Sequence, residues 1–149
     1  MYVDSQLQFS DAQAVTAAAA STNYLNLSAV RDVGTGRDLY VVVSVQTTLE
    51  DGGSNTGTDV YLRGDSDGSS FTPDGSQLLF SFDDGDVAGT VKFAKIDPGS
   101  LATQYQYVQL YFDPQGANLT AGKFDAFITT DIQKYKAYAD NRTITSPTA

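Results

Sequence analysis

The sequence predicts an all-β fold, a jelly-roll-like antiparallel β-sandwich of about eight strands with peripheral N- and C-terminal segments. Three observations lead to it. Short stretches alternate apolar and polar residues, Gly, Asp and Pro bound these stretches, and no stretch has a long helical pattern. The 149 residues suffice for one domain. We assign this domain to residues 1–133 and treat residues 134–149 as a C-terminal arm, because the alternation stops there.

The first structured stretch, residues 9–27, reads FSDAQAVTAAAASTNYLNL and has two interpretations. Ser10 and Gln13 have the spacing of a helix capping box ahead of an alanine run. A helix over residues 11–20 would have about ten residues, fewer than the roughly twelve at which even Ala-rich helices are marginal. The parity of Val15, Ala17, Ala19, Leu25 and Leu27 fits an extended chain instead. We expect a strand here and keep the helix as the alternative.

The clearest strand is residues 39–49, LYVVVSVQTTL, where Leu39, Val41, Val43, Val45, Thr47 and Leu49 share one face. Similar alternation predicts further strands, with Val60 and Leu62, then Leu78, Phe80 and Phe82, then Val91 and Phe93 facing inward. Val108, Leu110 and Phe112 share one face of a later strand, as do Phe124, Ala126, Ile128 and Ile132. These further strands are residues 24–27, 58–63, 77–82, 90–96, 105–112 and 123–132.

Acidic, glycine-rich turns separate the strands and raise the question of a metal site. Counted from Asp65, an EF-hand loop would need Gly at its sixth position and Glu at its twelfth, but the chain has Ser70 and Ser76 there. Asp83 and Asp84 lie together in another turn. Hairpin turns explain both stretches better, with an adventitious surface cation left open. We expect no metal and no cofactor.

Composition restricts the classes of function. The chain has no His and no Cys, so the Ser-His-Asp and Cys-His types of nucleophilic catalysis are excluded, and we expect no enzyme. The net charge of -9 repels a phosphate backbone, so we expect no nucleic-acid partner. Neither a membrane-spanning run nor a signal peptide is visible in the sequence. We therefore expect synthesis in the cytoplasm and a protein partner.

The aromatic residues are the main candidates for a contact surface. Tyr105, Tyr107 and Tyr111 lie opposite the apolar face of their strand, and Phe127 lies opposite that of its own. If both strands belong to one sheet, its second face is partly apolar. That face either binds a partner, since Tyr is enriched at interfaces, or packs under the C-terminal arm. The interface candidates are Tyr105, Tyr107, Tyr111, Phe127, Tyr135 and Tyr138.

The order of several motifs points to a family. SDAQAVTAAAASTNYLNL is followed by RDVGTGRDLYVVVSV, VYLRGDSDGSSF and YVQLYFDPQGANLTAGKFDAFITTDIQ. Over about residues 4–133 this order resembles the small capsid cement (decoration) proteins of tailed bacteriophages, of the Bordetella phage type. The alanine run, the acidic turn at residues 83–86 and the tail after Gln133 are particular to this chain.

The resemblance implies a jelly-roll-like fold and a non-enzymatic virion structural protein on the outer surface of the capsid. Such a protein would be made in the host bacterial cytoplasm, bind the major capsid protein and join its neighbouring subunits. Because symmetric association adds avidity, we expect a homo-oligomer, most simply a homodimer. The alternative is a carbohydrate-binding or receptor-binding β-sandwich module, because jelly rolls serve both roles.

Overall fold

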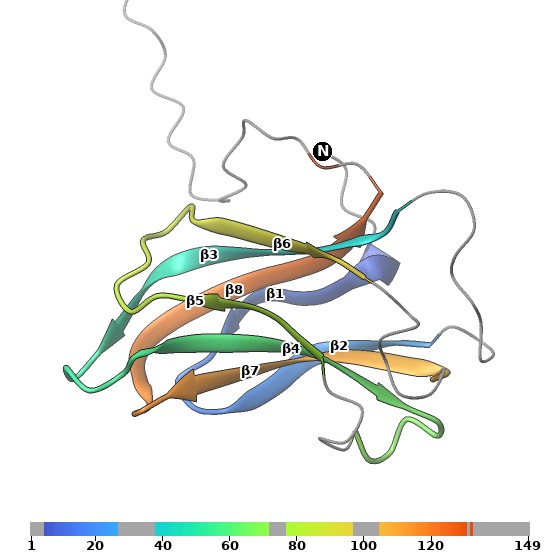
Figure 1. Ribbon diagram of the computed structural model, residues 1–149, viewed down its shortest axis with the longest axis horizontal. Coiled ribbons are helices and arrows are strands. Elements are labelled where there is room, and N and C mark those ends of the chain that lie inside the picture. The colour runs from blue at the N-terminus through green and yellow to red at the C-terminus, as the bar shows by residue number, and fades with distance from the viewer. Residues whose placement is uncertain (1–4, 27–37, 72–76, 97–104, 131, 133–149) are drawn as a thin grey trace, which may run out of the picture.

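The computed structural model describes residues 5–26, 38–71, 77–96, 105–130 and 132. Its elements are a short 3-10 helix, η1, and eight strands, drawn in Figure 1. Their bounds are η1 Ser5–Leu7, β1 Gln8–Ala14, β2 Ala19–Asn26, β3 Tyr40–Asp51, β4 Gly57–Asp65, β5 Gln77–Phe82, β6 Val91–Lys95, β7 Tyr107–Gln115 and β8 Leu119–Thr129. The predicted all-β class is confirmed. The predicted arm, residues 134–149, lies outside the described residues.

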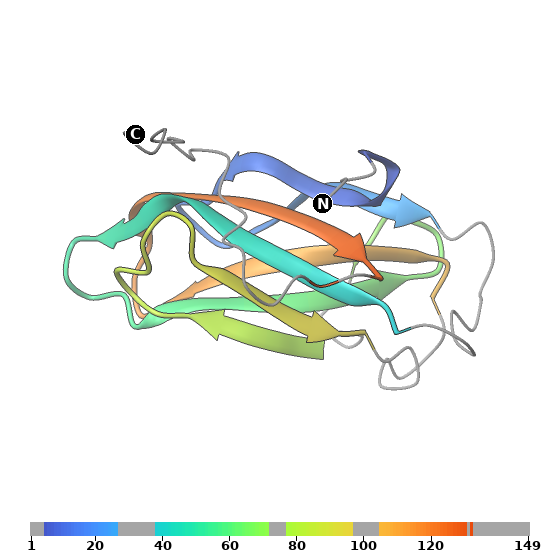
Figure 2. The ribbon, with the colours of Figure 1, turned by 90° about the horizontal axis from the view of Figure 1, so that it is seen from above.

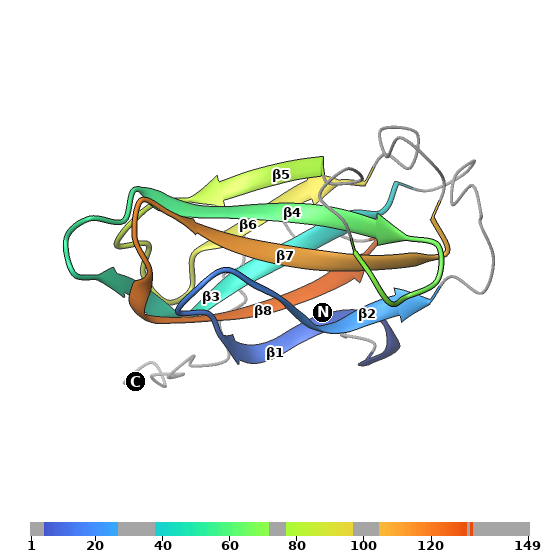
Figure 3. The same cartoon turned by 90° about the horizontal axis from the view of Figure 1, so that it is seen from below.

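The strands form two antiparallel sheets with the orders β1-β8-β3-β6 and β2-β7-β4-β5. Figure 2 shows the first sheet in front, and Figure 3 shows the second. The pairs β1–β8, β2–β7, β3–β6 and β4–β5 nest inside one another along the chain. The chain is thus a long double-stranded ribbon wrapped into two layers, which is the arrangement of a jelly roll.

The core lies between the two sheets and is built from the inward residues of both. Phe124 of the first sheet stacks on Phe112 of the second, with ring centroids 5.0 Å apart, and lies 5.3 Å from the ring of Phe82. All three rings are fully buried. Val41, Val43 and the other buried residues surround them, as the alternation predicts. Burial of this apolar surface is the main force holding the sheets together.

The opening stretch forms two strands in different sheets, joined by residues 15–18. The prediction of a strand instead of a helix is confirmed, but a single parity through the stretch is wrong because the chain turns a corner. The Gln13 side chain holds this corner. Its Oε1 accepts hydrogen bonds from Ser10 Oγ (2.6 Å) and the Thr22 amide (2.9 Å), and its Nε2 donates to the Ala20 carbonyl (2.7 Å).

A bulge in β1 accompanies the corner. Ala12 has a φ of 45°, which non-glycine residues rarely adopt, and the ladder with β8 shifts between Ser10 and Gln13. The Ala12 amide donates a hydrogen bond to Asp125 Oδ1 at 2.5 Å. This buried carboxylate partner on β8 explains how the unusual backbone is retained, and the bulge breaks up the free edge that β1 would otherwise present.

The predicted inward face of β6 is wrong. Phe93 pairs with Val42 on the outer side of the sheet and is 48% exposed. Lys92 takes the inward position, because it pairs with the buried Val43. Its aliphatic stem leads the ammonium to 5.1 Å from the centre of the Phe82 ring. A long side chain with an apolar stem can occupy a core-facing edge position while its charge reaches water, which alternation of residue types does not reveal.

Two other predicted inward residues also face solvent. Leu78 is 51% exposed because the β4–β5 ladder shifts between Val60 and Tyr61, which places Leu78 opposite the outward Tyr61. Thr47 is exposed because the β3–β8 ladder shifts between Val45 and Thr47. Each irregularity changes which residues face the core nearby, although in β3 a second shift between Thr47 and Glu50 leaves Leu49 buried as predicted.

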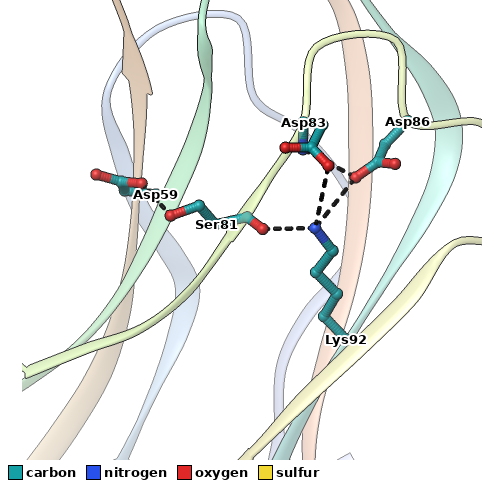
Figure 4. Close-up of polar contacts among 5 residues, drawn as sticks. All are labelled: Asp59, Ser81, Asp83, Asp86 and Lys92. Atoms are coloured by element: carbon teal, nitrogen blue, oxygen red, sulfur yellow. Dashed lines mark hydrogen bonds and ion pairs between the residues drawn. The ribbon is translucent and has the colours of Figure 1, made fainter.

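Lys92 also joins the two sheets along the edge where β5 and β6 meet (Figure 4). Its Nζ donates to the Ser81 carbonyl on β5 at 2.6 Å, and it forms ion pairs with Asp86 at 3.5 Å and Asp83 at 3.9 Å. The Asp83 amide donates to Asp86 Oδ2 at 2.9 Å. The acidic stretch at residues 83–86 is thus the predicted turn, and its Asp83 and Asp86 carboxylates contact Lys92 at this edge.

Candidate functional site

The predicted aromatic surface is divided between two faces of the molecule. β7 belongs to the β2-β7-β4-β5 sheet and β8 to the β1-β8-β3-β6 sheet, so the condition that both strands share one sheet is not met. Tyr107 and Tyr111 point outward from the second sheet, and Phe127 points outward from the first. The candidates therefore lie on opposite sides of the sandwich. Tyr135 and Tyr138 lie outside the described residues.

Tyr105 does not belong to either outer face. Its ring packs against the core cluster, next to Gly64 of β4. A Cβ added at Gly64 would lie 2.0 Å from Tyr105 Cδ2, so the ring occupies the space that a side chain at residue 64 would need. The predicted position of Tyr105, opposite the apolar face of its strand, is wrong because β7 begins only at Tyr107, and the alternation of the strand does not extend back to residue 105.

We define the tyrosine face as the outward residues Tyr24, Tyr61, Arg63, Tyr107 and Tyr111 of the β2-β7-β4-β5 sheet. At its centre the Arg63 guanidinium lies 3.3 Å from the centroid of the Tyr111 ring, and Tyr61 is the cross-strand partner of Tyr111. Arg63 Nε is buried and has no hydrogen-bond partner in the described structure. The aromatic ring thus holds the guanidinium through a cation–π contact in place of an ion pair.

One end of the tyrosine face is purely aromatic. Tyr24 lies edge-on to Tyr107, with centroids 5.7 Å apart, and 5.8 Å from the ring of Phe71. Tyr24 is 49% exposed, so this cluster is open to solvent. Sequence reasoning missed Tyr24 and Phe71 as site residues. The parity of residues 24–27 gave a signal for Tyr24, but Phe71 follows a turn, where no periodicity applies.

The turn beneath this aromatic cluster is held by Asp65. Its carboxylate accepts hydrogen bonds from the amides of Ser66 (2.8 Å), Ser69 (2.9 Å) and Ser70 (3.0 Å). These bonds, with that from Ser70 the largest influence, lower the pKa of Asp65 to about 2. The turn approaches Tyr107 closely, since a Cβ at Gly68 would lie 3.2 Å from the ring.

Within the described ranges, no group of three or more His, Cys, Asp or Glu residues could hold a metal ion.

The opposite end of the tyrosine face is acidic. Asp59 and Asp113 are cross-strand partners, so two carboxylates lie side by side on β4 and β7. The Tyr61 hydroxyl donates to Asp59 Oδ2 at 3.3 Å, and the Ser81 hydroxyl donates to Asp59 Oδ1. Burial, and then the charge of Asp59, raise the pKa of Tyr61, so this hydroxyl stays protonated and remains a donor. The face thus grades from aromatic through cationic to anionic.

The outer face of the other sheet carries a contrasting group, which we call the Val42 row. Across this sheet Val42 has Phe93 as its partner on β6 and Phe127 as its partner on β8. Val42 is 1% exposed and Phe127 4% exposed, although both point away from the core, whereas Phe93 is half-exposed. Phe93 also meets the Tyr40 ring edge-on at 6.2 Å. Of the predicted interface residues that the structure describes, only Phe127 lies here.

Fold and surface together define a two-layer jelly-roll protein with an aromatic and cationic outer face. The model of the Bbp16 family matches residues 9–128. Since this match covers most of the 149 residues, the chain belongs to the Bbp16 family, a family of Bordetella phage protein. The predicted resemblance to a Bordetella phage family is thereby confirmed, while the capsid role needs separate argument. No curated protein matches the chain. In the described part of the chain no helix has the length and hydropathy to span a bilayer.

Proposed function

We propose that the protein is a non-enzymatic capsid decoration protein, which binds the outer surface of an icosahedral phage head and joins neighbouring major capsid subunits. Membership of a phage family supports a role in the phage particle. The single observation that carries the proposal is the tyrosine face, an aromatic and arginine surface on the outer side of a sheet, where Tyr24 is 49% exposed. The proposal therefore names this face as the one that contacts the major capsid protein.

The composition of the tyrosine face suits protein recognition. Tyr and Arg dominate the binding energy of protein interfaces, because a flat ring or guanidinium buries much area for little loss of conformational entropy. Tyr111 and Arg63 already fix each other's orientation by stacking at 3.3 Å, which lowers that cost further. The Arg63 charge is also available to a carboxylate of the partner, because no salt bridge to it occurs among the described residues.

Binding of this kind would stabilise the head by mass action. A protein that binds only the assembled shell adds its binding free energy to the assembled side, about 2.7 kcal/mol per site at a hundredfold excess over Kd. A homodimer would engage two capsid subunits at once and gain avidity. The net charge of -9 suits the outside of the shell better than the lumen, where DNA would repel it. Light scattering after size-exclusion chromatography at tens of micromolar would reject the dimer by showing a monomer.

Binding to shells tests the proposal directly. Shells assembled from the major capsid protein of the same phage, but lacking this protein, are incubated with the chain, sedimented, and melted in a calorimeter. We expect co-sedimentation and a higher melting temperature of the shell. Tyr111→Ala should weaken binding by about 30-fold, equivalent to about 2 kcal/mol, the effect of losing one interface hot spot. Val87→Ala is the matched control, because it trims an exposed apolar residue in the turn after β5. Absence of shell binding by the unmodified chain overturns the proposal.

A carbohydrate-binding role is the second candidate, and one observation favours it. Gln106 Nε2 donates to Asn26 Oδ1 at 3.2 Å and to the Tyr107 hydroxyl at 3.3 Å, so amides lie beside the exposed aromatic cluster. Sugar sites combine rings with such polar groups. A glycan array separates the two roles. Specific sugar binding that Tyr24→Ala abolishes, together with no binding to shells, would replace the capsid role by this one.

A further inference from the structure

The tyrosine face carries one basic residue, whose charge is not paired within the sheet. Arg63 is the only Lys or Arg in the strands β2, β4, β5 and β7. Its Nε is buried without a hydrogen-bond partner, and no ion pair to it occurs among the described residues. A buried polar group that is left unpaired costs stability, so its presence in a folded protein calls for an explanation.

The acidic groups of the same sheet do not neutralise Arg63. Asp65 is the nearest of them along β4, but its carboxylate accepts hydrogen bonds from three backbone amides of the following turn. Asp59 and its cross-strand partner Asp113 lie four residues from the position of Arg63, about 13 Å along the strands. That separation exceeds the distance of about 8 Å over which exposed charges interact strongly in physiological salt. The Arg63 charge is therefore available to an external acceptor.

The Tyr111 ring determines how an acceptor can approach Arg63. The Arg63 Cζ lies 3.3 Å from the ring centroid, so the guanidinium must lie nearly flat on the ring, because a tilted plane would press its nitrogens into the ring carbons. Its terminal N–H groups then point sideways over the sheet, in the fixed fork that matches the two oxygens of a carboxylate. Because Nε is already withdrawn from water, the free protein lacks part of the hydration that binding would remove. The guanidinium is thus preorganised for a planar, bidentate anion.

The surroundings of Arg63 favour an acidic side chain of a protein as this anion. The rings of Tyr24, Phe71 and Tyr107 on the same face offer apolar area that a small inorganic anion would leave uncovered. A phosphate backbone is repelled by the net charge of -9. An Asp or Glu residue with apolar neighbours on a protein surface would satisfy both the charge and the rings.

From the unpaired charge, its fixed orientation and its aromatic neighbours, we propose that Arg63 selects the partner by binding an Asp or Glu side chain of the major capsid protein through its terminal N–H groups. Tyr111 is the positioning residue that holds the guanidinium for this contact. The inference rests on the proposed function and deepens it, because it states what the capsid surface must present. That surface feature is a carboxylate with apolar residues beside it.

Binding of variants to shells that lack this protein tests the assignment. Arg63→Met keeps a long apolar side chain on the Tyr111 ring but removes the charge, and we expect binding to weaken by about 30-fold or more. Arg63→Lys keeps the charge without the bidentate fork and should weaken binding by about tenfold. Gln109→Met is the matched control, because it places the same side chain on the cross-strand partner of Arg63. This control should change binding by less than about threefold.

Three further measurements separate recognition of a carboxylate from a structural role of Arg63. Added salt should weaken binding by the unmodified chain and by Gln109→Met, but much less by Arg63→Met. Shells whose exposed carboxylates are converted to neutral amides with a carbodiimide and glycinamide should bind the unmodified chain as weakly as native shells bind Arg63→Met. The free Arg63→Met chain should melt within about 3 °C of the unmodified chain, because no ion pair in the described structure is lost.

The possible results distinguish this inference from the capsid role. If the unmodified chain and Arg63→Met bind native shells equally, the inference is overturned while the capsid role stands. If amidated shells bind the unmodified chain at full strength, the acceptor is not a capsid carboxylate, and the inference fails in the same way. A change in oligomeric state caused by Arg63→Met in light scattering would assign Arg63 to a contact between copies and would also overturn it. Absence of binding between the unmodified chain and native shells overturns the proposed function, and the inference with it.

Discussion

The two outer faces of the sandwich differ in the residues that their central strands point outward. β4 directs Asp59, Arg63 and other polar groups into the tyrosine face, where Tyr24 is half-exposed. β3 directs Tyr40, Val42, Ser44 and Gln46 outward, and none of them is charged. The difference teaches that outward parity alone does not define an open surface. Charged outward residues on β4 accompany the open face, whereas on the other face the outward carboxylate of Asp125 on β8 is buried and accepts the Ala12 amide.

The largest expected effect comes from placing a charge on each face. Val42→Asp puts a carboxylate at a position that is 1% exposed, which should cost roughly 3 kcal/mol or more of unfolding free energy. Gln109 on β7 is the cross-strand partner of Arg63 in the other sheet. Gln109→Asp should change the unfolding free energy by less than about 1 kcal/mol. Urea unfolding followed by circular dichroism measures both. Equal losses would remove the distinction between the faces.

A smaller effect is expected at the edge that connects the faces. Lys92→Met keeps an apolar stem over Phe82 but removes the hydrogen bond to Ser81 and the ion pairs with Asp83 and Asp86. We expect a loss of about 1 kcal/mol in thermal unfolding, because the groups are partly exposed. The shell binding that we propose for the tyrosine face should be unchanged. A large loss of binding would mean that the two faces cannot be perturbed separately.

The smallest expected effect is a pH dependence that is confined to the tyrosine face. The three hydrogen bonds from backbone amides hold the pKa of Asp65 at about 2, below its ordinary 3.8. The ionised carboxylate therefore holds the turn above about pH 4, and this contribution is lost as the pH falls toward 2. The Ser70 amide and the Tyr107 ring should report this loss in NMR spectra, while the β3 amides remain unchanged. Asp65→Asn should abolish this titration step. If the β3 amides showed the same titration step, the change could not be a local effect of Asp65.

Much of the fold could be predicted from alternation and turn residues. Alternation predicts the strands at residues 39–49 and 123–132, because one face of each is mostly apolar. The Asp-rich stretches predict turns, because Asp accepts hydrogen bonds from nearby amides. The reversals at Phe93, Leu78 and Thr47 could not be predicted, since they depend on ladder shifts and on a lysine stem that replaces an apolar side chain. Such shifts are set by the partner strand and not by local sequence.

The candidate site was predictable only in part. Tyr107 and Tyr111 were identified by parity, but their neighbours Tyr61 and Arg63 come from a strand about fifty residues earlier in the chain. No spacing within the sequence shows that β7 pairs with β4. The same limit explains why Phe127 was grouped with these tyrosines, because consecutive strands in a jelly roll alternate between sheets at this point.

The nested pairing of strands has a consequence for how the chain is made. Among the described strands β1 pairs only with β8, and the Ala12 amide reaches an Asp125 carboxylate 113 residues later. During synthesis, residues 8–14 must therefore wait unpaired until nearly the whole domain has left the ribosome. Pairings so distant along the chain close large loops before they gain contacts, which makes folding slow. Because Asp125 holds the bulge at Ala12, this irregular backbone is also completed only when β8 is available.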